Sequence, residues 1–101
     1  MKINIEVDYT PLQTLMANII NDCKNKGFLT YVVKNTIEVY YKDNYAEIVF
    51  DYKLKELNED NTAIFGIMFK ITNFTNDNFA KEIHEIVVSH LCDTKRYPFL
   101  L

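Results

Sequence analysis

The chain has 101 residues, of which 49% are hydrophobic and 25% are charged, and its formal net charge is −3. This length suits a single domain with a modest core, over residues 1–101, and the composition is that of an ordinary globular protein. Because the charge is mildly acidic and no basic stripe is visible, we expect no general nucleic-acid binding.

The N-terminal residues and the cysteines favour a cytoplasmic location. The first eight residues, MKINIEVD, alternate apolar with polar or acidic positions and do not resemble a signal peptide. No window approaches the ~20 apolar residues of a membrane span. Cys23 and Cys92 both fall near apolar helical positions, which predicts two buried free thiols in a reducing compartment rather than a disulfide.

The first two predicted elements are a strand and a helix. Residues 2–8 alternate in the manner of a half-buried strand. Apolar residues then recur at steps of three and four, which predicts a helix over residues 11–26 with one apolar stripe. The stripe consists of Leu12, Leu15, Met16, Ile19, Ile20 and Cys23. Thr10 is suited to cap this helix, and Gly27 is a natural stop signal.

Residues 36–72 are the stretch around which we expect the sheet to be organised. Strands are predicted over residues 28–33, 36–42, 45–57 and 62–72, with turns at 34–35, 43–44 and 58–61. The turn at 34–35 lacks glycine, so one long bent strand over residues 28–42 is the alternative. The last strand is apolar at nearly every position, which predicts a central place in the sheet. Gly66 within it suggests a bulge.

A second helix and an apolar tail complete the chain. The helix is predicted from a cap at Thr75 or Asn76 to about Leu91, again with one apolar stripe. The stripe consists of Phe79, Ala80, Ile83, Ile86, Val87 and Leu91. Residues 97–101 carry four large apolar side chains. They should dock either as an irregular edge strand on the chain's own sheet or on a second copy.

The order β-α-β-β-β-β-α predicts an α+β fold. Both helices have a single apolar stripe, so each has one face to bury. The economical arrangement is a two-layer sandwich, in which an antiparallel sheet of about five strands carries both helices on one face.

The residues that carry catalysis or bind metals form no recognisable motif. His84 and His90 are six residues apart, whereas the zinc-protease helix places its two histidines four apart. The chain has two glycines, too few for a phosphate-binding glycine loop. A base and nucleophile pair, either His84 with Cys92 or His90 with Cys23, would lack a glycine-rich turn for an oxyanion hole. We therefore expect no enzymatic activity, no cofactor and no metal site.

The tyrosines point to a binding surface on the sheet. Tyr40 alternates away from the apolar positions of its strand, and Tyr45 does the same in the next strand. Both should lie on the face that the helices leave open. The predicted partner-binding residues are Tyr40, Tyr45, Val49, Ile64 and Met68, with Glu59 and Asp60 at an acidic hairpin tip. The alternative is that tyrosine is present only because it suits strands.

Small size, mild acidity, aromatic strands and the lack of a catalytic set together favour a non-enzymatic protein-binding module. Its type would be an inhibitor that covers a surface of a nuclease or toxin-like target, as an anti-CRISPR-like protein of a phage or mobile element or a toxin-immunity protein does. The alternative is a homo-oligomeric structural or accessory phage protein, with a homodimer as one form. A small enzyme is the weakest alternative.

Overall fold

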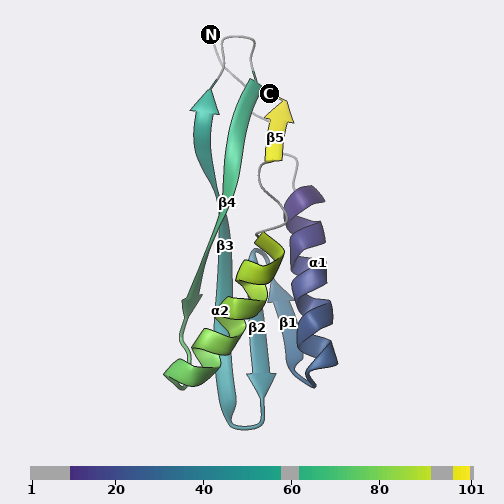
Figure 1. Cartoon of the computed structure of the whole chain (residues 1–101), viewed down its shortest axis with the longest axis vertical. Coiled ribbons are helices and arrows are strands. Elements are labelled where there is room, and N and C mark those ends of the chain that lie inside the picture. Colours follow the sequence, from purple (N-terminus) through teal and green to yellow (C-terminus); the bar gives the residue numbers. More distant parts are fainter. Residues whose placement is uncertain (1–9, 58–61, 92–96, 101) are drawn as a thin grey trace.

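The computed structural model describes residues 10–57, 62–91 and 97–100, with side chains described for residues 12–51 and 66–91. The elements are α1 (Thr10–Asn25), β1 (Leu29–Val33), β2 (Thr36–Tyr41), β3 (Asn44–Leu57), β4 (Thr62–Thr72), α2 (Asp77–Leu91) and β5 (Tyr97–Leu100). The strands form an antiparallel sheet in the order β1-β2-β3-β4-β5, and the two helices flank the strands β1 to β4 (Figure 1). The predicted α+β class is confirmed. The strand predicted at residues 2–8 lies outside the described residues.

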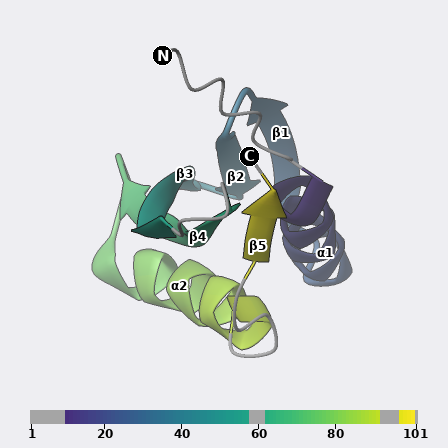
Figure 2. The same ribbon diagram turned by 90° about the horizontal axis from the view of Figure 1, so that it is seen from above.

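Both helices and one face of the sheet share a single buried cluster. Its members are Leu12, Leu15, Met16, Ile19, Cys23, Phe28, Ile37, Val39, Ala46, Ile48, Phe50, Phe79, Ile83, Ile86 and Val87. The helical members all belong to the two predicted stripes, whose other residues, Ile20, Ala80 and Leu91, are only partly buried. The sheet members alternate along β2 and β3, so they occupy one face of both strands. Figure 2 shows the helices from above, alongside the strands that they cover.

The C-terminal end of α1 and the N-terminal end of α2 follow the predicted signals, whereas Thr10, the predicted cap of α1, already lies within the helix. Gly27 has a φ of 81°. Its N–H donates to the carbonyl of Lys24 at 3.0 Å, and the N–H of Phe28 donates to that of Cys23 at 2.9 Å. These two bonds are a Schellman motif, so the glycine ends α1 as expected. Asn76 caps α2, because its Oδ1 accepts from the N–H of Phe79 at 2.8 Å.

A tight turn at residues 34–35 separates β1 from β2, which excludes the single bent strand. Lys34 has a φ of 56°, and Asn35 is tied to the neighbouring strand. The N–H of Phe50 donates to the carbonyl of Asn35 at 2.9 Å, and the Asn35 side-chain amide donates to the carbonyl of Phe50. These bonds to β3 stabilise a turn that has no glycine.

The next turn lies one residue earlier than predicted. Tyr41 is paired with Asn44, so the turn is made by Lys42 and Asp43 instead of residues 43–44, and Lys42 takes the positive φ of 54°. A two-residue change of register keeps every side chain on its own face. The apolar pattern therefore does not distinguish the two turns, and turn propensity favoured the wrong one.

The prediction that β4 is the central strand is wrong. β3 is the middle strand in the order, and β4 pairs with β5 only along residues 62–65. Past that point β4 has one neighbour among the described strands, and Met68 is 47% exposed. Ile67, Phe69 and Ile71 are half-buried against the core from one face. Over residues 66–72, where side chains are described, β4 is therefore buried on one face only, although its apolar composition would suit burial on both.

The register shift in the long hairpin also differs from expectation. It lies in β3 between Leu54 and Glu56, whereas Gly66 pairs regularly with Lys53.

The tail behaves as predicted for docking on its own sheet. β5 pairs with β4 at the end of the hairpin that extends beyond both helices, with Pro98 opposite Ile64 (Figure 1).

Candidate functional site

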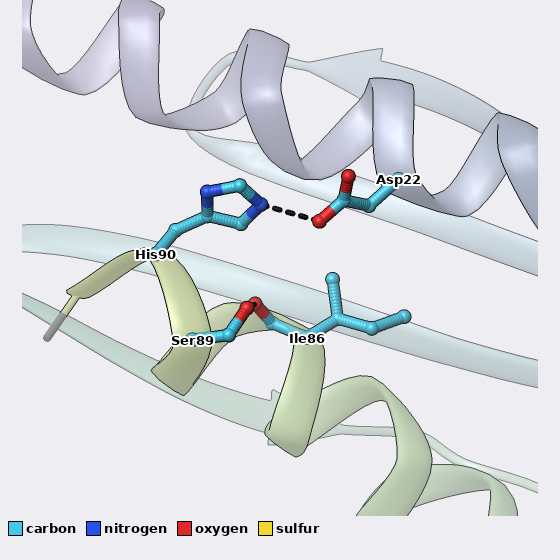
Figure 3. A network of polar contacts seen from close by, with 4 residues as sticks. All are labelled: Asp22, Ile86, Ser89 and His90. Atoms are coloured by element: carbon cyan, nitrogen blue, oxygen red, sulfur yellow. Dashed lines mark hydrogen bonds and ion pairs between the residues drawn. The ribbon is translucent and has the colours of Figure 1, made fainter. Parts of the chain in front are cut away.

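Asp22 and His90 form the one close acid–imidazole pair between the two helices in the described part of the chain. His90 Nε2 lies 2.5 Å from Asp22 Oδ2, and the Ser89 hydroxyl beside it donates to the carbonyl of Ile86 at 2.7 Å (Figure 3). Lys26, just after the end of α1, and Glu82 of α2 form a second, longer and more exposed contact of 3.7 Å. These pairs join residues far apart in the chain and link the end of α1 to α2.

Cys23, next to Asp22, is unsuited to serve this pair as a nucleophile. Its side chain is fully buried and forms no disulfide. Burial raises the pKa of the Cys23 thiol to about 11, and the neighbouring Asp22 carboxylate acts in the same direction. A nucleophilic cysteine needs the opposite shift, toward thiolate at neutral pH. The prediction of a buried free thiol is confirmed for Cys23, and Cys92 lies outside the described residues.

The two histidines do not converge on a metal. The ring of His84 lies against Phe69, with centroids 5.2 Å apart, whereas His90 contacts Asp22. Over the described ranges, no group of three or more histidine, cysteine or acidic side chains could hold a metal ion.

Three tyrosines gather on the sheet face opposite the helices. Tyr40 of β2 is paired with Tyr45 of β3, and their ring centroids are 4.7 Å apart. Tyr31 of β1 meets Tyr40 edge to face at 5.7 Å. Their strand neighbours Val39 and Ala46 are buried in the core, so alternation turns the tyrosines to the open side. Tyr31 and Tyr40 both remain exposed.

Two glutamates lie beside these rings. The Tyr40 hydroxyl donates to Glu38 Oε1 at 2.9 Å, and the Tyr45 hydroxyl donates to Glu47 Oε1 at 2.6 Å. Each glutamate is two residues from its tyrosine, the spacing that puts both side chains on one face of a strand. We call Tyr31, Tyr40, Tyr45, Glu38 and Glu47 the open-face cluster.

Glu47 is the most strongly held member of the open-face cluster. Its Oε2 also accepts from the Asn73 side-chain amide at 2.7 Å and from the Thr72 hydroxyl at 3.3 Å. The bonds from Tyr45 and Asn73 lower the pKa of the Glu47 carboxyl. Partial burial and the bond to Glu47 raise the pKa of Tyr45. The bond to Glu38 likewise raises the pKa of Tyr40.

Like charges lie opposite each other in the open-face cluster. Glu38 and Glu47 are register partners on neighbouring strands. Directly opposed like charges destabilise a sheet. Neither carboxylate forms an ion pair with a basic side chain of the described residues. The face therefore combines aromatic surface with negative charge that a cation from outside would neutralise.

The loop before α2 fixes the position of Tyr45. The N–H of Tyr45 donates to Thr75 Oγ1 at 3.0 Å, and the N–H of Thr75 donates to the carbonyl of Tyr45 at 3.0 Å. The Asn76 amide donates to Asn44 Oδ1 at 2.5 Å. The start of β3 and the start of α2 are thus tied together, which holds the cluster on ordered backbone.

The predicted site residues are only partly brought together. Tyr40 and Tyr45 touch; Val49 and Met68 lie on the same face, with Val49 half-buried between Thr36 and Lys70. Ile64 is placed in β4 by its backbone, opposite Glu56, and its side chain is not described. Glu59 and Asp60 lie outside the described residues. The binding role of all of them stays a prediction.

Sequence reasoning missed Tyr31, Glu38 and Glu47. The sequence did contain a signal for the two glutamates, because each lies two residues from its tyrosine and therefore on the same face of the strand. Tyr31 needed the register of β1, where it lies opposite Glu38. That register follows only once the turn at residues 34–35 is accepted.

Comparison with known proteins found no matching family model, no matching curated protein and no matching solved structure. In the described ranges, neither helix has the length and apolar character needed to cross a membrane.

Proposed function

We propose that the chain is a small, non-enzymatic protein-binding module that acts by covering a surface of its target with its open sheet face. The observation that carries the proposal is the open-face cluster, three contacting tyrosines bonded to two glutamates. Tyrosine is enriched in interfaces because it offers a large area with a polar tip at low entropic cost. Held by its hydrogen bonds, the cluster is preorganised for binding.

The charge of the cluster specifies the chemistry of the partner. Glu38 and Glu47 face each other without basic partners among the described residues, and Tyr31 and Tyr40 expose their rings beside them. Arginine satisfies both groups, because its guanidinium pairs with carboxylates and stacks on aromatic faces. The partner should therefore present arginine or lysine side chains to this face.

Within this class we favour an inhibitor of a nuclease or toxin-like protein, working in the cytoplasm. Nucleases hold the phosphate backbone with lysine and arginine, so their active surface offers the basic groups that the cluster needs. The two biological forms of this proposal are an anti-CRISPR-like protein of a phage or mobile element and a toxin-immunity protein. The net charge of −3 supports attraction to such a surface.

Site-specific cross-linking tests the proposal. A photoreactive amino acid is placed at Tyr40 or at Val49 on the open face, and at Lys81, an exposed position of α2, as control. The same protein should be captured in the source cells from both open-face positions and not from Lys81.

Binding of the captured partner then provides the quantitative test. Glu38→Gln and Tyr40→Ala should each weaken it about tenfold or more, with weaker binding at high salt. The exposed α2 variant Glu85→Ala should bind as the wild type does. Equal capture from Lys81, or full affinity in both cluster variants, would contradict the proposal.

A further inference from the structure

Among the described strands, β1 is an edge strand with few of the features that normally protect an edge. It is the terminal strand in the order of the described sheet. Four of its five residues, Leu29, Tyr31, Val32 and Val33, are large, apolar and more than half exposed. Soluble proteins usually blunt such an edge with a charge, a proline or a bulge. The segment 29–33 contains no charge or proline, and its pairing with β2 is regular.

The outer side of β1 also offers backbone hydrogen-bonding groups. A two-residue turn closes on a hydrogen-bonded pair, which here is Val33 and Thr36. The bond from Phe50 N–H to the carbonyl of Asn35 agrees, because it directs Asn35 toward β3 and Thr36 toward β1. Hydrogen bonding alternates along a strand, so the backbone groups of Thr30 and Val32 point away from β2.

We propose that β1 pairs antiparallel with β1 of a second copy of the chain, about a two-fold axis at Tyr31. In this register Leu29 lies opposite Val33 of the second copy, and Tyr31 lies opposite Tyr31 of the second copy. Thr30 of each copy exchanges backbone hydrogen bonds with Val32 of the other. The sheet continues across both copies, and the interface is isologous, as a two-fold dimer requires.

The sequence of β1 is self-complementary in this arrangement. Leu29, Tyr31 and Val33 each meet an apolar side chain, Val32 meets Thr30, and no like charges are opposed within residues 29–33. A single pair of five-residue strands is small against the ~800 Å² that each partner buries in a stable complex. The dimer should therefore be weak and form as concentration rises. This inference does not depend on the proposed partner.

Sedimentation velocity from micromolar to millimolar concentration tests the dimer. The double variant Leu29→Lys with Val33→Lys opposes like charges across the axis and should weaken association about tenfold or more. The matching double variant Leu29→Glu with Val33→Glu should behave alike. Mixing the two variants should restore a heterodimer of wild-type affinity or better. Met68→Lys, a similar change on β4, should leave association unchanged.

The mixing step separates the dimer from a folding defect, because two misfolded variants do not restore each other. Far-ultraviolet circular dichroism checks that each variant is folded. A wild-type chain that stays monomeric at millimolar concentration would overturn the proposal. If the amides of Thr30 and Val32 in that monomer exchange slowly, another segment of the chain occupies the edge. An equal loss of association in Met68→Lys would move the interface to the open face and also overturn the proposal.

Discussion

Replacing Ile83 with alanine tests whether α2 packs on the sheet as the structure indicates. Ile83 is fully buried in the cluster that joins both helices to β2 and β3. The change removes three carbon atoms, each worth about 0.8 kcal/mol of transfer free energy, and the remaining cavity adds a further cost. We expect a loss of about 2–5 kcal/mol, the usual range for a buried aliphatic. Leu15→Ala in α1, also buried, should cost a similar amount.

Urea denaturation followed by circular dichroism measures this loss. Total stability for a domain of this size is about 5–15 kcal/mol, so the midpoint should fall clearly while the slope m stays constant. The matched control is Glu85→Ala on the exposed side of the same helix, which should stay within about 0.5 kcal/mol of the wild type. A loss below about 1 kcal/mol for Ile83→Ala would refute the packing of α2 against the sheet.

Titration, thiol chemistry and turn geometry give three further predictions. The lowered pKa of Glu47 stabilises the fold above about pH 4.3, and this stability is lost as pH falls through the folded pKa, so Glu47→Gln should flatten the acid side of a stability–pH curve. The raised pKa of Tyr45 stabilises the fold below about pH 10, and this stability is lost as pH rises through the folded pKa, so Tyr45→Phe should flatten the alkaline side of the same curve. Unchanged stability–pH curves in the two variants would contradict both assignments. Cys23 should react with a thiol reagent only at the rate of unfolding, because it is buried with a pKa of about 11; rapid labelling of the folded chain, followed by mass spectrometry at that residue, would disprove this. Gly27→Ala should cost about 1–2 kcal/mol, since φ is 81° there, whereas Lys34→Gly at a φ of 56° should be neutral or stabilising by up to about 1 kcal/mol; thermal melts showing the reverse order would contradict the turn geometry.

The helices and their buried faces were predictable from sequence, because their signals are local. The steps of three and four that selected Leu15, Ile19 and Ile83 depend only on helical geometry, and all three side chains are buried. Gly27 and Asn76 likewise act through bonds to residues close by in the chain. Such signals are complete within a few turns of helix.

The position of β4 was not predictable in the same way. An apolar run records how much surface a strand can bury, but not how many neighbours it obtains. β4 pairs with β5 along residues 62–65 only, and Met68, beyond that pairing, is nearly half exposed. The bulge near Lys55 was missed for a related reason, because it arises from the pairing of two long strands and no residue type marks it.

The open-face cluster was half predictable. Alternation within single strands is enough to turn Tyr40 and Tyr45 away from the helices. The opposition of Glu38 to Glu47, and the contact of Tyr31 with Tyr40, require the register between strands. A change of the turn by one residue shifts that register by two, which leaves the faces intact but gives every side chain a different opposite neighbour.

The simple order of the sheet has a consequence for how the chain folds. From β1 to β4, each strand pairs with the next one along the sequence, so every hairpin closes a short loop. Contact between α1 and α2 instead joins distant parts of the chain, and the Asp22–His90 pair spans 68 residues. Short loops lose less entropy on closure and form sooner. The strands are therefore expected to pair first, and the seam between the helices, which closes last, is where the native protein should begin to open.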